Sequence, residues 1–276
     1  MSHRKRRRKQ SGGKVWLTLG LVFLLILAAG GSILALRYFH KKDAKSSYEE
    51  MKMVVNDIQI PNEEKETEEA DVLSQMGIEV PPKNLDWEAL RQENADIYAW
   101  VYVPDTAVDY PVLQHPTDNS YYLDYNMDGT KGYPGCIYTE DYNTKTFTDI
   151  HTVLYGHNLK DGTMFSTLHN FEDAQMMNTD HYIFIYTEDY VYVYQIFAAY
   201  EYPGIHLLAN YDLTNAYVYE DFLNSVYMAN AGVANIREDI AVTAENQIIT
   251  LSTCTSQNHY DPRLRFLVTG VLLNPR

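Results

Sequence analysis

The chain has 276 residues, with 22 Lys and Arg against 37 Asp and Glu, so its formal net charge at pH 7 is −15. A nucleic-acid-binding protein needs a basic surface to displace counterions, so this balance argues against that function. Only two cysteines are present, which excludes a disulfide scaffold, and 46% hydrophobic residues exclude wholesale disorder.

The positive charge is concentrated at the start of the chain. Residues 1–45 hold 11 basic residues and one acid, a net of +10, and residues 46–276 hold the other 11 and 36 acids, a net of −25. The uncharged run Val15–Leu36 has 22 residues, and about 20 helical residues cross a bilayer core. A cleaved signal peptide is the alternative, but its apolar region is only about 7–15 residues long. Basic flanks stay inside, so we expect a cytoplasmic tail (1–14), a transmembrane helix (15–36) and an extracellular body.

Residues 37–83 have the composition of an extracellular tether. Glutamates crowd this stretch, aromatic residues are few, and Pro81-Pro82 closes it. Such a composition favours a solvated spacer that repels itself and extends, with some helix as the alternative. The folded domain is then expected over residues 84–276.

The folded domain should open with a helix and continue with many short strands. Trp87, Leu90 and Arg91 follow one another at helical spacing, with Asn84 or Asp86 as the N-cap. Alternating or apolar runs then predict strands, with one helix, Asn215–Met228, in the insert before the last two. Many strands with few helices favour a closed or nearly closed β architecture. The predicted strands are Ala99–Val103, Val108–Leu113, Gly135–Tyr138, His151–Tyr155, His181–Thr187, Tyr190–Tyr200, Gln247–Thr253 and Arg265–Leu272.

Cys254 is the candidate nucleophile. It follows the predicted strand that ends at Thr253, where a thiol is held rigidly and can still reach solvent. A reactive thiol needs a positive neighbour, and Arg263 and Arg265 lie 9 and 11 residues downstream. A buried, inert cysteine is the alternative. Cys136, inside an apolar strand, is expected in the core. A disulfide between the two cysteines would consume the nucleophile, so we do not favour it.

His157 is the candidate partner of this thiol. It directly follows a predicted strand, and Gly156 lets the backbone turn the imidazole inward. A cysteine and a histidine that are distant in sequence and close in space are typical of nucleophilic catalysis. Five other histidines, in polar or turn contexts, are expected on the surface: His115, His169, His181, His206 and His259.

Two patterns resemble metal sites, and neither predicts one. Residues 124–129 follow the first half of a calcium loop, but the twelfth position is Gly135 where the loop needs a bidentate Glu. His151 and His157 have no third ligand at suitable spacing. We therefore expect no metal and no cofactor.

Together these segments resemble the sortases, the membrane-anchored cysteine transpeptidases of Gram-positive bacteria, and specifically class B. The resemblance covers about residues 84–276. Thr250–Cys254 is similar to the nucleophile signature, Leu154–Phe165 to the catalytic histidine segment, and Arg265–Gly270 to the strand that opens with the catalytic arginine. Trp100, residues 109–112 and 118–123, and the insert around 205–240 resemble class B segments.

The resemblance implies an eight-stranded β-barrel with N-terminal helices. It also implies that Cys254 attacks the Thr carbonyl of a C-terminal sorting signal on a secreted protein, that His157 protonates the leaving amine, and that Arg265, in preference to Arg263, supports the oxyanion. An amine of peptidoglycan or lipid II would resolve the thioacyl enzyme and anchor the protein to the wall. The residues implied to line the substrate groove are Asn119, Tyr122, Leu123, Ser252 and Thr253.

Three other functions remain open. The acceptor amine could belong to a pilin lysine, which would make the enzyme a pilus polymerase. Water could resolve the thioacyl enzyme, which would make it a thiol protease. The chain could also be a non-catalytic, membrane-tethered binding ectodomain in which Cys254 is only structural.

Overall fold

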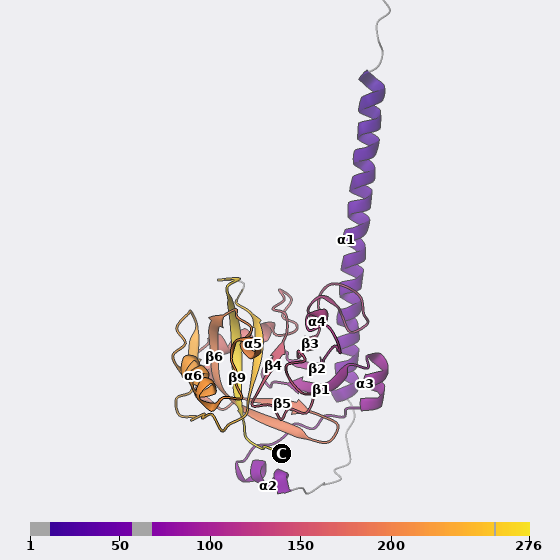
Figure 1. The fold of residues 1–276 in the computed structure, drawn as a ribbon. Coiled ribbons are helices and arrows are strands. Elements are labelled where there is room, and N and C mark those ends of the chain that lie inside the picture. The colour runs from indigo at the N-terminus through magenta and orange to yellow at the C-terminus, as the bar shows by residue number, and fades with distance from the viewer. Residues whose placement is uncertain (1–11, 57–67, 257) are drawn as a thin grey trace, which may run out of the picture. The chain divides into compact units, whose positions relative to one another are not determined.

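The computed structural model describes residues 12–56 and 68–276 except residue 257 (Figure 1). The chain divides into two compact units, Met1–Asp43 and Ala44–Arg276. Residues 1–11 of the expected cytoplasmic tail and residues 57–67 of the expected tether lie outside the described residues.

The first unit contains the expected membrane segment. Helix α1 (Gly12–Asn56) includes Leu19–Leu36, which has a mean hydropathy of 2.6 and no buried share. This stretch of 18 residues is long and apolar enough to cross a membrane and fits a single-pass anchor.

Part of the expected tether belongs to the second unit. The end of α1 places Tyr48 and Val55 in the core, each 4% exposed. The Tyr48 hydroxyl donates to the carbonyl of Gly135 over 3.0 Å. Helix α2 (Glu68–Gln75) adds Leu73, which is also buried. The isolated apolar residues of this acidic stretch therefore pack against the body, while its many carboxylates remain compatible with solvent.

Helix α3 (Trp87–Glu93) has the predicted N-cap. Asp86 adopts an extended backbone, and its carboxylate accepts a hydrogen bond from the backbone N–H of Ala89 over 3.0 Å. Leu90 is the buried residue of this helix. Of the two capping candidates, the structure therefore selects Asp86.

Eight strands close into a barrel in the order β5–β1–β2–β3–β4–β8–β9–β6, with β6 pairing again with β5. The pairs β2–β3 and β4–β8 are parallel, and the other pairs in the barrel are antiparallel. The predicted mainly β, closed eight-stranded architecture is confirmed. The strands are β1 (Ile97–Tyr102), β2 (Asp109–Leu113), β3 (Ile137–Tyr138), β4 (His151–Tyr155), β5 (Tyr182–Tyr186), β6 (Val191–Pro203), β8 (Ile248–Cys254) and β9 (Leu264–Leu272).

β6 is long enough to belong both to the barrel and to the insert. Its first half pairs with β5, its second half pairs with the short strand β7 (Ala234–Ile236), and β9 runs along its other edge. Helix α6 (Ala216–Tyr227) lies in the insert beside β6 and β9 (Figure 1). Its apolar side, predicted from spacing, is buried: Tyr219, Phe222, Leu223 and Val226 are at most 2% exposed.

Short helices lie in the loops between the strands. They are α4 (Tyr121–Asp124), α5 (Leu207–Asn210) and the 3₁₀ helices η1 (Ser166–Glu172) and η2 (Met176–Asn178).

Candidate active site

Cys254 is the last residue of β8, one position beyond the predicted strand end. The preceding residues of β8, Ile248–Thr253, are all buried, while Cys254 is partly exposed. β4 and β9 pair with β8 on its two edges, so the strand that ends at the thiol is held from both sides. The structure thus places a rigidly held thiol at a solvent-accessible strand end.

The sheet register pairs two predicted site residues and brings the strand before the third alongside. Cys254 lies directly opposite Arg265 in the last pair of the β8–β9 ladder. On the other edge of β8, Tyr155 pairs with Ser252, and the N–H of Gly156 donates to the carbonyl of Ser252 over 3.1 Å. Continuing this parallel register by two residues sets His157 level with Cys254.

The His157 ring is oriented by its own neighbours. Its Nε2 lies 2.7 Å from the carbonyl oxygen of Leu123. A carbonyl only accepts hydrogen bonds, so Nε2 carries a proton and Nδ1 is the nitrogen left for proton transfer. Tyr133 makes an edge contact with the ring at 4.9 Å between centroids. Among the described residues, no hydrogen bond joins His157 to the Cys254 thiol.

Two glycines beside His157 are required, each for a different reason. A Cβ on Gly156 would lie 2.5 Å from Ile137 and 2.7 Å from Phe165, so Gly156 is required by close packing. Its φ lies outside the left-handed region, so this requirement does not come from the backbone freedom of glycine. Gly135 does adopt a left-handed φ of 68°, and a Cβ there would lie 3.2 Å from the His157 ring.

The two candidate arginines differ in their partners. Arg263 pairs with Asp261 through two hydrogen bonds of 3.0 and 2.6 Å, its side chain is 85% exposed, and it lowers the pKa of Asp261 to about 2. Arg265 is partly buried and donates only to the carbonyls of Pro262 and Leu264, at 3.1 and 2.8 Å. Within the described part of the chain, Arg265 has no ion pair, so its charge is available to an anionic group at the site.

The residues implied to line the groove have different environments. The Leu123 side chain is 41% exposed, and its carbonyl holds His157. Asn119 exchanges hydrogen bonds with Asp141 at 2.6 and 2.9 Å. Tyr122 is 2% exposed and its hydroxyl donates to Asp96 over 2.7 Å, so this side chain supports the wall of the site from inside.

Ser252 and Thr253 lie on opposite faces of β8, because side chains alternate along a strand. Ser252 shares the face of Cys254, two residues before it, and both Ser252 and Thr253 are buried. The Thr253 hydroxyl has no hydrogen-bond partner among the described residues. Ser252 is therefore the better placed of the two to approach a ligand beside Cys254.

Cys136 has the environment predicted for a core residue. It is 1% exposed, and the Tyr48 hydroxyl donates to its sulfur over 3.3 Å. Burial raises the pKa of the Cys136 thiol to about 12, which keeps it protonated and unreactive near neutral pH. Both cysteines are free thiols.

The described residues contain no group of three metal-ligating side chains. In the acidic turn, the Asn126 amide oxygen accepts from the N–H of Gly135 over 2.9 Å, and Asp128 accepts from Thr130 over 2.9 and 2.6 Å. These oxygens shape the loop that carries Gly135 toward His157.

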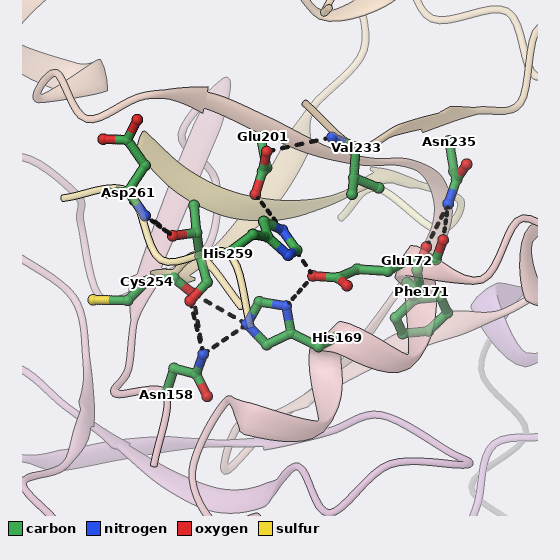
Figure 2. Close-up of polar contacts among 11 residues, drawn as sticks. Asn158, His169, Phe171, Glu172, Glu201, Val233, Asn235, Cys254, His259 and Asp261 are labelled. Carbon is green, nitrogen blue, oxygen red and sulfur yellow. Dashed lines mark hydrogen bonds and ion pairs between the residues drawn. The ribbon is translucent and has the colours of Figure 1, made fainter. Parts of the chain in front are cut away.

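The sequence interpretation missed His169 and Asn158 (Figure 2). His169 was expected on the surface, but its side chain is 14% exposed and its Nε2 lies 3.1 Å from the Cys254 carbonyl. The Asn158 amide donates to the Thr255 carbonyl over 3.0 Å. His169 is 85 residues from Cys254, and no local pattern signals a contact over that separation.

Comparison with known proteins agrees with this barrel and this strand end. A sequence model of the sortase domain matches residues 101–273. Sortase B of Listeria monocytogenes is 34% identical over 185 residues, which cover 67% of this chain and 72% of that protein. The structure of Clostridium perfringens sortase B superposes with a TM-score of 0.58 at 27% identity, over 67% of this chain and 98% of that one. A Staphylococcus aureus sortase B–substrate complex shares the fold, with a TM-score of 0.62 at 23% identity over 86% of this chain and 100% of that one.

The barrel, the free thiol at its strand end and these relatives define a cysteine transpeptidase. The chain belongs to the sortase family and, within it, to the class B sortases.

Proposed function

We propose that this sortase uses Cys254, His157 and Arg265 to cleave a C-terminal sorting signal after Thr and to join the new carboxyl end to an amine of the cell wall. The observation that supports the proposal is the pairing of Cys254 with Arg265 in the β8–β9 ladder, together with the parallel pairing of β8 with β4, the strand that His157 follows. The assignment of the sorting signal and of the acceptor rests on the resemblance to the family.

The chemistry proceeds in two acyl transfers. The Cys254 thiolate attacks the Thr carbonyl and forms the S–C bond, and Arg265 donates hydrogen bonds to the oxyanion. The C–N bond breaks as His157 gives a proton to the leaving amine. An amine of peptidoglycan or lipid II then attacks the thioester, its proton returns to His157, and the thiolate leaves. Leu123 and Ser252 are placed to line the acyl site, with Asn119, Tyr122 and Thr253 shaping its walls.

The expected membrane anchor determines where this reaction would take place. The apolar part of α1 would hold the enzyme in the cell membrane with its basic head, residues 1–14, in the cytoplasm and the barrel outside. The substrates would then be secreted proteins, and the acceptor would lie in the wall.

Mass spectrometry of the full-length chain in detergent tests the proposal. The probe is a pool of peptides with Thr at the cleavage position, with and without triglycine as the amine. We expect a thioacyl adduct on Cys254 that triglycine discharges into a ligated product, and no adduct in Cys254→Ala. The matched control, Cys136→Ala, should keep the adduct because Cys136 is buried.

Three outcomes would redirect the assignment. Hydrolysed product alone, even at high amine concentration, would favour a thiol protease. Discharge by a lysine-containing pilin peptide but not by triglycine would favour a pilus polymerase. If none of the peptides forms an adduct on Cys254, a non-catalytic binding ectodomain would be favoured.

A further inference from the structure

A chain of alternating imidazoles and carboxylates lies behind the end of β8 (Figure 2). His169 Nδ1 is 2.6 Å from a carboxylate oxygen of Glu172, and His259 Nε2 is 3.9 Å from the same oxygen and 2.9 Å from Glu201. The side chain of Glu201 is 4% exposed and that of Glu172 is 23% exposed. These groups come from η1, β6 and the segment before β9, and His169, at one end of the chain, contacts the backbone of Cys254.

His169 contacts β8 at the Cys254 carbonyl, which lies beyond the last backbone pair between β4 and β8. Carbonyls alternate between the two edges of a strand, so the carbonyl of Cys254 points to the same edge as that of Ser252. The N–H of Gly156 donates to the Ser252 carbonyl, and the backbone ladder between the two strands stops there. The Cys254 carbonyl instead has the His169 Nε2 at 3.1 Å and the Asn158 amide at 3.4 Å.

His169 bridges two partners through its two nitrogens. Glu172 accepts the Nδ1 proton, since a carboxylate can only accept. Nε2 faces the Asn158 amide at 2.9 Å and the Cys254 carbonyl at 3.1 Å. The neutral ring accepts from the amide, and the charged ring donates to the carbonyl. The charged imidazole ties the end of β8 to η1 directly, and the neutral imidazole does so through Asn158, whose amide donates to the carbonyls of Cys254 and Thr255.

The Cys254 sulfur points away from His169 in Figure 2, so this histidine does not exchange protons with the thiol. The ring is also held by stacking on Phe266, with centroids 4.6 Å apart and an interplanar angle of 25°. Phe266 neighbours Arg265 on β9. One imidazole is thus fixed against both strands that carry proposed catalytic residues.

We propose that His169, oriented by Glu172, is a positioning residue that fixes the end of β8 and thereby aims the Cys254 thiol toward the acyl site. This inference rests on the proposed role of Cys254 as the nucleophile. Small displacements of a reacting group slow catalysis strongly, by up to about 100-fold for roughly 1 Å. Asn158 assists by holding the next carbonyl, that of Thr255.

The variant His169→Phe separates hydrogen bonding from packing. Phenylalanine keeps a ring that can stack on Phe266 and lacks both nitrogens. We expect kcat for ligation of a Thr-containing peptide to triglycine to fall at least about 10-fold, with KM changed less than about 2-fold. His169→Gln should recover part of the loss, because its amide can accept from Asn158 and donate to the Cys254 carbonyl. The measurements use the full-length chain in detergent.

The matched control is His181→Phe, which should keep the wild-type kcat. His181 also contacts an aromatic ring of η1, Phe171, but its nitrogens face Thr179 and Asp105. Wild-type kcat in His169→Phe, or a His169→Gln variant as slow as His169→Phe, would overturn the positioning role. If His169→Phe does not fold, Glu172→Gln decides: a lower kcat at unchanged KM supports the role, and an unchanged kcat overturns it.

The wild-type chain distinguishes this inference from the proposed function. A wild type that forms no adduct on Cys254 contradicts the proposed function itself. A wild type that forms the adduct, together with a His169→Phe variant that is equally fast, contradicts the positioning role alone.

Discussion

Residues of the same type have different chemical environments in this protein because their partners differ. Cys136 and Cys254 are both free thiols, but burial holds the first in its protonated form. Arg263 and Arg265 are two residues apart, yet Asp261 pairs with the first and leaves the second unpaired within the described chain. The availability of a group, and not its presence in a motif, decides which member of each pair can serve catalysis.

The arginine pair gives a direct test. We expect Arg265→Ala to lower kcat/KM for peptide ligation by about 100-fold or more, the cost of removing an oxyanion donor. Arg263→Ala should change kcat/KM less than about 3-fold, since its charge is already paired at the surface. Arg265→Lys should remain slow, because an ammonium does not reproduce the planar fork of a guanidinium. Steady-state kinetics of the three variants provide the measurement, and the reverse order of the two alanine variants would contradict the assignment.

Among the secondary-structure elements, β8 ends at Cys254, and β4, which pairs with it in parallel, ends two residues before His157. At its other end β4 buries His151. His151 Nε2 lies 2.8 Å from the Thr250 hydroxyl, which makes a further contact with Thr269 on β9. A side-chain hydrogen-bond chain therefore crosses three strands inside the sheet.

Burial of His151 predicts a pH-dependent stability. Burial lowers the pKa of His151 to about 3, so the unfolded chain binds a proton near pH 6.5 that the folded chain does not bind. The stabilisation is complete above pH 6.5 and declines as the pH falls from 6.5 toward 3. Between pH 6.5 and 5 the loss is about 2 kcal/mol, at 1.36 kcal/mol for each pH unit.

Denaturant unfolding at pH 7.5 and pH 5 measures this effect. The wild-type chain should lose about 2 kcal/mol more over this interval than His151→Phe, which cannot take up the proton. Equal losses in the two proteins would show that His151 does not govern the acid sensitivity.

At the scale of the whole molecule, the closed barrel and the apolar helix have separate roles. Among the described strands, closure of the barrel leaves only the short strand β7 at an open edge of the sheet, and Cys254 lies where β8 ends. Leu19–Leu36 supplies a segment whose length and composition suit a bilayer. The segment 37–83 is less independent than its composition indicates, because Tyr48, Val55 and Leu73 lie in the core of the second unit.

Charged substitutions in the apolar segment test whether the first unit is a membrane anchor. Leu25→Asp together with Ala29→Asp should cost about 5–7 kcal/mol of insertion free energy, at about 2.5–3.5 kcal/mol for each residue near the helix centre. We expect the full-length variant to leave the membrane fraction after alkaline carbonate extraction, while the wild type stays. The matched control places two Asp residues at the exposed positions Tyr217 and Met228, on and at the end of α6, which are 81% and 75% exposed. Extraction of the wild type, or retention of the helix variant, would contradict an integral anchor.

The local pattern of the sequence predicted most of the barrel strands and the helix of the insert. It predicted β4 with its observed bounds, and apolar spacing predicted the buried side of α6. The resemblance of residues 250–254 and 154–165 pointed to Cys254 and His157. Such features are readable because a strand or a helix repeats its contacts every two or every three to four residues.

Only the tertiary structure decided which distant groups meet. The pairing of β1 with β5, the parallel pairing of β4 with β8 and the contact of His169 with the Cys254 carbonyl each join groups separated by long stretches of chain. The requirement for glycine at position 156 likewise depends on Ile137 and Phe165, which a Cβ there would approach too closely. Local periodicity carries no information on such pairs, because the free energy of each contact depends on neighbours that the fold supplies.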